Sequence, residues 1–249
     1  MNEIEYKDFY DRVGISNGWD FSKLRVTSEG VTWQLYEEVK KKCSGTEVLL
    51  DIGTGGGENV LNMASSFLLG IGIDNSNGMM STAQSNLNKA NVSNVRFVQM
   101  SSECLQFPSE FFDVISCCHA PFSAGEAARV LKKGGFFLTQ QVGEADKLNL
   151  KSAFGRGQSF GVEDGVLRDN YITQLQEAGF HIVELLEYDA LEYYERPEDL
   201  IFLLKHTPII PNFGQHQDDF SILNDFIANN RTPKGICTNS RRFMIVASK

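Results

Sequence analysis

Residues 49–61, LLDIGTGGGENVL, place four glycines in five positions directly after an apolar run that ends in an acid. The apolar run is typical of a buried strand, and the residues after the glycines suit a helix. Glycine lets the backbone turn sharply and approach a ligand closely, and the first turn of a helix offers free N–H groups to a polar or anionic ligand. The stretch therefore predicts a strand, a ligand-binding turn and a helix.

The segments that follow alternate between strand and helix patterns. Strands are predicted over 48–50, 70–74, 95–100, 112–118, 136–142, 181–188 and 241–248, and helices over about 59–66, 76–90, 126–134 and 169–178. Strands separated by helices imply a parallel sheet whose two faces are both covered. We therefore expect an α/β fold that places its ligand contacts at the carboxyl ends of the strands.

Two segments lie outside this alternation. Residues 1–43 contain an aromatic-rich stretch and a predicted helix that Thr27 and Ser28 cap and that runs to about Lys42, so we expect a helical cover. Residues 188–238 are too long for a simple connection. They carry predicted helices over 198–206 and 218–228, and we expect them to form a lid inserted before the last strand. We expect one domain over residues 1–249. Besides these two segments, it would contain a core sheet over 44–187 and a last strand over 239–249.

Composition narrows the classes of protein to consider. A formal net charge of -9 disfavours a partner such as nucleic acid that is bound by general attraction to phosphate. No apolar stretch of about 20 residues could span a bilayer, and the start of the sequence lacks the pattern of an export signal. We expect a cytoplasmic protein that does not bind membranes. The five cysteines show no zinc or disulfide spacing, so we expect reduced thiols, and the oligomeric state stays open.

Two familiar nucleotide loops fit the glycine cluster poorly. The dinucleotide pattern G-x-G-x-x-G would need glycine at position 58, where the chain has glutamate, and that carboxylate would crowd a pyrophosphate. A P-loop would need a lysine followed by serine or threonine after the glycines. A nicotinamide oxidoreductase therefore remains a distant alternative, which titration with NADH would test.

The pattern that fits is D-x-G-x-G-x-G, and it resembles the first motif of the class I S-adenosylmethionine-dependent methyltransferases. Asp74, at the end of the next strand, resembles the acidic ribose contact of this family, and a carboxylate can accept hydrogen bonds from both ribose hydroxyls. The segment 95–108 resembles the family's adenine-binding strand end, except that Ser101 stands where an acid is common, so Ser102 and Glu103 are predicted instead. The segments 111–122 and 129–138 resemble the fourth and fifth strands of the family.

This resemblance implies a seven-stranded, mostly parallel Rossmann-like sheet with an antiparallel last strand. It also implies S-adenosyl-L-methionine as cofactor and S-adenosyl-L-homocysteine as product. The cofactor-binding residues that it implies are Asp51, Gly53, Thr54, Gly55, Gly57, Asp74, Asn75, Met79, Ser102, Glu103 and Cys117.

Methyl transfer from a sulfonium is a direct displacement, so the protein mainly aligns the reactants and excludes water. A base is needed only if the acceptor carries a proton that must leave. His119 is the candidate base because it follows the fourth strand directly, and the alternative is a hydrogen-bonded loop residue. Adjacent Cys117 and Cys118 point in opposite directions along a strand, so we predict no metal site with His119.

The acceptor is expected to lie between the two added segments. The predicted acceptor-binding residues are Tyr10, Trp19, Tyr194 and His206, and further possible contacts are Tyr193, Arg196, Lys205 and Phe213. Arg196 and Lys205 could meet an anionic acceptor, although charges on a helix are more often solvated.

The sequence leaves three functions open. The first is a methyltransferase for a small, partly apolar molecule. The second is an RNA methyltransferase, because the insert and residues 232–249 resemble uncharacterised bacterial members of the superfamily, some of them grouped with ribosomal RNA modifiers. The third is a regulatory protein that binds S-adenosylmethionine without transferring methyl.

Overall fold

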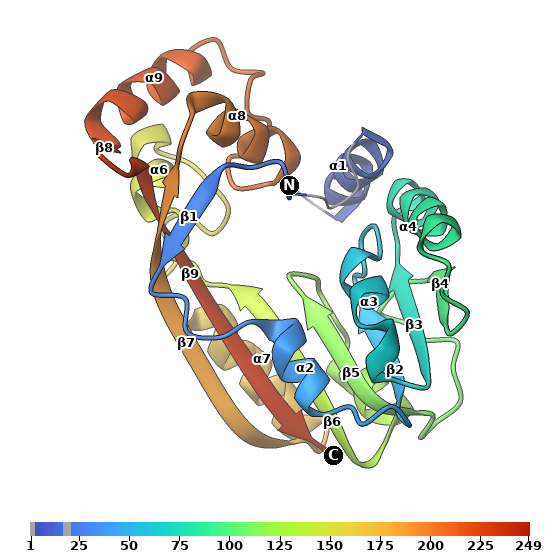
Figure 1. Cartoon of the computed structure of the whole chain (residues 1–249). Helices are drawn as coiled ribbons and strands as arrows, with labels where there is room; N and C mark the ends of the chain where they lie inside the picture. The colour runs from blue at the N-terminus through green and yellow to red at the C-terminus, as the bar shows by residue number, and fades with distance from the viewer. Residues whose placement is uncertain (1–2, 17–20) are drawn as a thin grey trace.

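The computed structural model describes residues 3–16 and 21–249, and this part of the chain forms one twisted sheet flanked by helices (Figure 1). The strands are β1 (Val26–Glu29), β2 (Val48–Ile52), β3 (Leu69–Asp74), β4 (Val95–Gln99), β5 (Phe112–Cys118), β6 (Leu131–Val142), β7 (His181–Tyr194), β8 (Arg231–Thr232) and β9 (Gly235–Ser248). Their order is β1-β7-β9-β6-β5-β2-β3-β4, and β8 pairs with β9.

The predicted sheet is confirmed in its central part. Strands β4, β3, β2, β5 and β6 are parallel neighbours, and β9 runs antiparallel between β6 and β7. These seven strands are the ones that the sequence predicts. The described residues nevertheless form nine strands and not seven, because β1 adds to the edge of β7 and β8 forms a short hairpin with β9.

Helices cover the two faces of this sheet and the ends of its strands. They are α1 (Glu3–Ser16), α2 (Leu35–Lys41), α3 (Glu58–Asn62), α4 (Asn77–Ala90), α5 (Ala124–Val130), α6 (Leu148–Phe154), α7 (Val166–Glu177), α8 (Pro197–His206) and α9 (Asp219–Asn230), with a short 3-10 helix over Ala64–Ser66. None of the helices within the described ranges has both the length and the apolar character needed to cross a bilayer.

Two predicted helix boundaries are wrong. The helix expected from Thr27 begins only at Leu35, because residues 26–29 pair with β7 as strand β1, and sheet pairing outweighs the local capping signal. The helix expected to continue to Gly134 ends at Val130, because Leu131 already pairs with Phe112 as the first residue of β6. In both places a distant strand decides the local structure.

The core consists of two apolar layers, one on each face of the sheet. Leu49 and Leu50 are both fully buried, but they belong to different layers because successive side chains on a strand point to opposite faces. Leu50 packs with Ile115 and Phe137, whereas Leu49 packs with Trp33. Asp51, the acid that ends the apolar run, therefore projects from the same face as Leu49.

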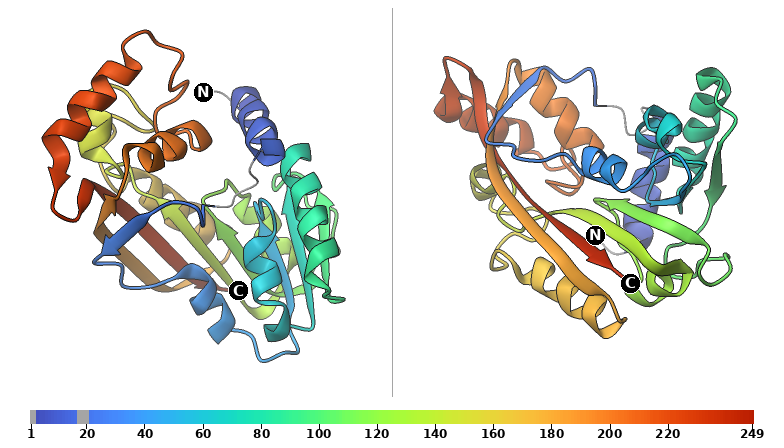
Figure 2. Two further views of the ribbon diagram at one scale, coloured as in Figure 1. Left: turned by 45° about the horizontal axis from the view of Figure 1, so that its top comes forward. Right: turned by 60° about the horizontal axis from the view of Figure 1, so that its bottom comes forward.

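The segment after β7 is built on two strands that are longer than predicted. Pairing of β7 with β9 continues to Tyr194 and Ile236, so these strands extend beyond the other strands, as Figure 2 shows. Residues 195–234, here called the insertion, contain α8 and α9 and share an apolar core with α6 that includes Leu150, Leu204 and Phe226. Helix α1 lies between the insertion and α4 (Figure 1).

Candidate functional site

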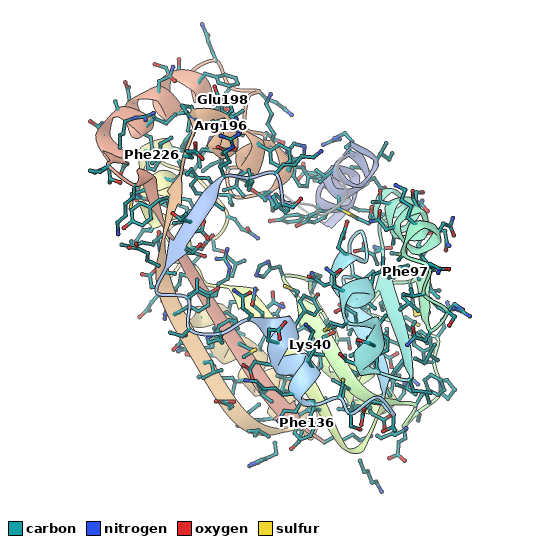
Figure 3. All side chains as sticks on the ribbon, in the orientation of Figure 1. Lys40, Phe97, Phe136, Arg196, Glu198 and Phe226 are labelled. Atoms are coloured by element: carbon teal, nitrogen blue, oxygen red, sulfur yellow. The ribbon has the colours of Figure 1, made fainter. Side chains whose placement is uncertain are left out.

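The glycine loop joins β2 to α3 at the carboxyl edge of the sheet. The φ angles of Gly53, Gly55 and Gly57 are +70°, +58° and +77°, values that other residues rarely adopt. A Cβ atom on Gly53 would lie 2.2 Å from the Ala120 side chain, and one on Gly57 would lie 2.2 Å from the ring of Phe97, which Figure 3 labels. The loop therefore requires glycine, and it leaves bare backbone beside the strand ends.

Asp74 ends β3, next to this loop. Its two carboxylate oxygens accept hydrogen bonds from the backbone N–H of Gly55 at 3.1 Å and of Ser76 at 2.9 Å. Burial raises the pKa of Asp74 above its ordinary value, and these hydrogen bonds oppose the shift. A carboxylate can accept about four hydrogen bonds, so lone pairs remain for a ligand.

Asp51 is buried under the loop with unsatisfied hydrogen-bonding capacity. One oxygen, Oδ1, accepts hydrogen bonds from the Ser116 hydroxyl at 2.6 Å and the Tyr36 hydroxyl at 3.3 Å. Burial raises the pKa of Asp51 to about 6 against the effect of these bonds and of the nearby Thr54 hydroxyl. Neither Asp51 Oδ2 nor Thr54 Oγ1 makes an aligned hydrogen bond, although both atoms are buried. Their position beside the bare backbone fits the polar end of a ligand.

The other residues predicted to bind the cofactor lie around the neighbouring strand ends. Ser102 donates a hydrogen bond to the carbonyl of Pro121 at 3.0 Å, which joins the loops after β4 and β5. Asn75 and Glu103 are exposed at this edge. Met79 and Cys117 are buried, and the Cys117 thiol donates to the Ala120 carbonyl at 3.2 Å. The structure thus gathers the predicted set at one edge, with Met79 and Cys117 inside its wall.

His119 follows β5 in a left-handed conformation, with a φ of +55°. Its Nε2 atom lies 2.7 Å from the side-chain nitrogen of Gln140, and because that amide donates, Nε2 accepts and the ring is neutral. Burial, with a smaller contribution from the charge of Arg242, lowers the pKa of His119 to about 3. The ring is therefore a poor base near neutral pH, and its catalytic role stays a prediction.

Next to His119 lies a network of buried charges that the sequence patterns did not predict. Arg242 donates to Asp146, and Lys147 donates to Glu192 at 2.8 Å. Burial alone would raise the pKa of Glu192, but the charge of Lys147 holds it near 2. Tyr194, a predicted acceptor contact, donates to Glu192 at 2.6 Å and belongs to this network.

Some of the missed residues carry a signal in the sequence. Ser116 stands in the otherwise apolar stretch VISCC of β5, and Gln140 follows the apolar run FFL and Thr139 within β6. A polar residue in a buried strand needs a partner, and Ser116 lies directly opposite Asp51 in the register. The partners of Arg242 and Glu192 come from distant parts of the chain, and no local pattern marks them.

Helix α1 docks against the beginning of α4. The carboxylate of Asp11 accepts hydrogen bonds from the Ser76 hydroxyl at 2.7 Å and from the backbone N–H of Gly78 at 3.3 Å. Tyr10 lies close enough to Asp74 for that charge to add to the effect of burial, which is the main cause of its raised pKa. Trp19 lies outside the described residues.

The end of β7 and the insertion contribute the remaining predicted residues. Lys205, His206 and Phe213 line a cavity of about 230 Å³ between α1 and the insertion. Arg196 pairs with Asp199 at 2.8 Å, and Tyr193 is buried with the ammonium of Lys234 5.3 Å from its ring centroid. Figure 3 shows Arg196 and Glu198 at the beginning of α8. Across residues 3–16 and 21–249, no three His, Cys, Asp or Glu residues gather as a possible metal site.

The middle of the chain is similar to known proteins. Residues 49–135 match the model of a methyltransferase domain. The uncharacterized methyltransferase YcgJ of Bacillus subtilis is 36% identical over 104 residues, which is 39% of this chain. The match spans about two fifths (41%) of the length of that relative.

Solved structures resemble this fold over most of its length. A candidate methyltransferase of Bacillus halodurans superposes with a TM-score of 0.62 at 20% identity, over 86% of this chain and 96% of the other. The YcgJ structure gives a TM-score of 0.58 at 20% identity over 86% and 97%. The [4+2]-cyclase SpnF gives 0.58 at 18% identity over 88% and 84%. The family match covers residues 49–135, and the solved structures share the overall fold, so the middle of this chain is similar to a methyltransferase domain.

Proposed function

We propose that this protein transfers a methyl group from S-adenosyl-L-methionine to a small-molecule acceptor, leaving S-adenosyl-L-homocysteine. The observation that carries the proposal is the pair of buried atoms Asp51 Oδ2 and Thr54 Oγ1 beside the glycine loop, which lie near each other but make no aligned hydrogen bond. A buried polar atom without a partner costs about 1–3 kcal/mol. A ligand that brings polar groups to this loop removes that cost.

The residues present fit this donor. The open lone pairs of Asp74 suit the two hydroxyls of a ribose, and Asp51 with Thr54 suits the amino-acid end. The glycine backbone admits the ligand closely, and we assign Ser102 and Glu103, in the loop after β4, to the adenine. When bound, the donor supplies a methyl group already activated by its sulfonium.

The chain's own residues then position the acceptor and exclude water. Alignment of this kind supplies up to about 7–11 kcal/mol of the barrier. Because its pKa is lowered to about 3, we assign His119 to orienting the acceptor or Gln140 by hydrogen bonding. An acceptor that loses no proton before transfer, or that loses it to water, suits this site.

A small acceptor is favoured over RNA by the size of the cavity between α1 and the insertion. Helix α1 and the insertion lie on either side of a cavity of about 230 Å³, which is too small for a nucleic acid strand. The formal charge of -9 gives no general attraction to phosphate. The likeness to a [4+2]-cyclase means that methyl transfer itself must be measured, because one fold supports several chemistries.

The test has a binding arm and a turnover arm. Calorimetric titration with S-adenosyl-L-homocysteine should show one site, and methyl-labelled donor should label a product in a small-molecule extract but not in total RNA. Label in RNA alone would favour an RNA methyltransferase, and binding without any labelled product would favour a regulatory protein. Tight binding of NADH with no binding of the homocysteine product would refute the donor assignment.

A further inference from the structure

The cavity between α1 and the insertion has walls suited to an apolar group. Phe9 and Val13 contribute from α1, while Leu204, Ile210 and Phe213 contribute from the end of α8 and the loop after it. Its volume of about 230 Å³ is somewhat below the range of about 300–1,000 Å³ typical of small-ligand pockets. The space therefore suits one end of a small molecule.

The two charged side chains that line the same cavity, Arg12 and Lys205, are both positive. Arg12 comes from α1, and Lys205 and His206 come from α8, while no Asp or Glu is among the described residues that line it. The Nδ1 atom of His206 is hydrogen-bonded to the Phe202 carbonyl at 2.7 Å, and the His206 ring stacks on that of Phe202. The imidazole is thus fixed in orientation at the cavity wall.

Within the described residues, Arg12 and Lys205 lack the carboxylate partner that most other basic residues near the site have. Arg242, Lys147 and Arg196 each pair with a carboxylate within 4 Å. Over residues 3–16 and 21–249, Arg12 and Lys205 make no such ion pair. In a chain with a formal charge of -9, two cations without an acid converge on one partly apolar cavity.

We propose that this cavity binds the carboxylate end of an amphipathic acceptor, with Arg12 and Lys205 as its charge partners. Guanidinium matches a carboxylate through two parallel hydrogen bonds, and an ammonium adds a point charge. The apolar part of the ligand lies against Phe213 and its neighbours. This inference rests on the proposed methyl transfer only in naming the ligand as the acceptor.

Helix α1 connects this cavity to the donor side. Phe9, Arg12 and Val13 face the cavity, whereas Asp11 contacts Ser76, two residues after Asp74. The two helices approach so closely that a Cβ on Gly78 would lie 2.2 Å from the Asp11 carbonyl oxygen. One helix therefore borders the cavity and also contacts the segment that follows Asp74.

The test uses octanoate and phenylacetate as anionic probes, with octanamide as the neutral match of octanoate. Calorimetry on the full chain should show that at least one carboxylate binds and that octanamide binds at least tenfold more weakly. The double variant Arg12→Gln, Lys205→Gln should weaken carboxylate binding at least tenfold. Lys133→Gln, which removes an exposed charge near the start of β6, should leave it unchanged.

Parallel titration with S-adenosyl-L-homocysteine separates the two proposals. The homocysteine product should bind the double variant as it binds the unchanged protein, and it should not displace the carboxylate. Equal carboxylate binding by the double variant, displacement by the product, or no binding of either carboxylate to a protein that binds the product would each overturn the inference. Failure of the product to bind would instead remove the proposed function.

Discussion

The two halves of the carboxyl edge are built in different ways. The residues of the proposed donor half lie between Asp51 and Cys117, and the contacts of Asp74 in it are main-chain ones, from the N–H groups of Gly55 and Ser76. The proposed acceptor half is assembled from α1, the ends of β5 and β6, the insertion and β9, and side-chain contacts such as those of Arg242 with Asp146 and of Lys147 with Glu192 join its parts. A local motif therefore specifies the donor half, while the acceptor half depends on the whole fold.

The largest effect that we expect is a loss of folding stability when the buried charge network is broken. Asp146→Ala leaves Arg242 in a buried position without its carboxylate, and loss of one member of a buried pair costs about 3–5 kcal/mol. Urea denaturation should show this loss of unfolding free energy. Affinity for S-adenosyl-L-homocysteine, measured below the unfolding transition, should stay unchanged.

The control for that variant is Asp189→Ala. Asp189 lies on β7, the strand next to the one that carries Arg242. Asp189 is exposed and accepts a hydrogen bond from Asn239, so its loss should cost less than about 1 kcal/mol. Equal costs for the two variants would mean that the buried network does not hold the acceptor half. A large loss of product affinity in Asp146→Ala would mean that the two halves are not independent.

The second effect is on donor affinity. Asp74→Ala removes an acceptor of two backbone hydrogen bonds and of the proposed ribose contacts. Hydrogen bonds to a charged group contribute about 1.5–3 kcal/mol, so calorimetry should show product affinity lower by about 10- to 150-fold. Circular dichroism should confirm that the variant is folded. Unchanged affinity in a folded variant would place the ribose elsewhere.

The sheet and the donor half could be predicted because their signals are local. Apolar periodicity locates β2, and the glycines after it need positive φ angles that the structure confirms at Gly53, Gly55 and Gly57. Asp74 falls at the end of the next strand because strands and helices alternate. None of these features needs a contact between distant parts of the chain.

The acceptor half could not be predicted in the same way. Strand β1 forms only because residues 26–29 pair with β7, about 165 residues later, and the local sequence instead suggests a helix cap. Arg242 meets Asp146 across 96 positions, and Asp11 meets Ser76 across 65. Sequence spacing carries no information about such pairs. His119 was identified, but its lowered pKa depends on burial that only the fold provides.

The lowered pKa of His119 makes the burial of this ring measurable as a pH dependence of folding stability. The folded value is near 3 and the unfolded value near 6.5, so the unfolded chain binds the proton first and stability falls as pH drops below about 6.5. Between pH 7 and pH 5 this contributes a loss of up to about 2 kcal/mol. His119→Asn, which tolerates the left-handed backbone, should reduce that loss in urea denaturation at the two pH values. Identical pH dependence would show that His119 is solvated.

The smallest global effect, under about 1 kcal/mol, is expected where the two halves meet. Gly78→Ala places a Cβ atom against the Asp11 carbonyl, which should release α1, while the gain in helix propensity within α4 offsets part of the lost packing. Hydrogen exchange over residues 5–15 should become faster. Octanoate should bind more weakly because Phe9 and Arg12 leave with α1.

Gly125→Ala is the matched control for this variant. Gly125 lies in the first turn of α5, and the nearest atom to its Cβ would be the Ser123 hydroxyl at 4.0 Å, so the change should be tolerated. Exchange over residues 5–15 should then match that of the unchanged protein. Faster exchange in both variants would point to a general loosening, whereas faster exchange in Gly78→Ala alone, with product affinity kept, would show that α1 closes the acceptor half and that the glycine loop binds without it.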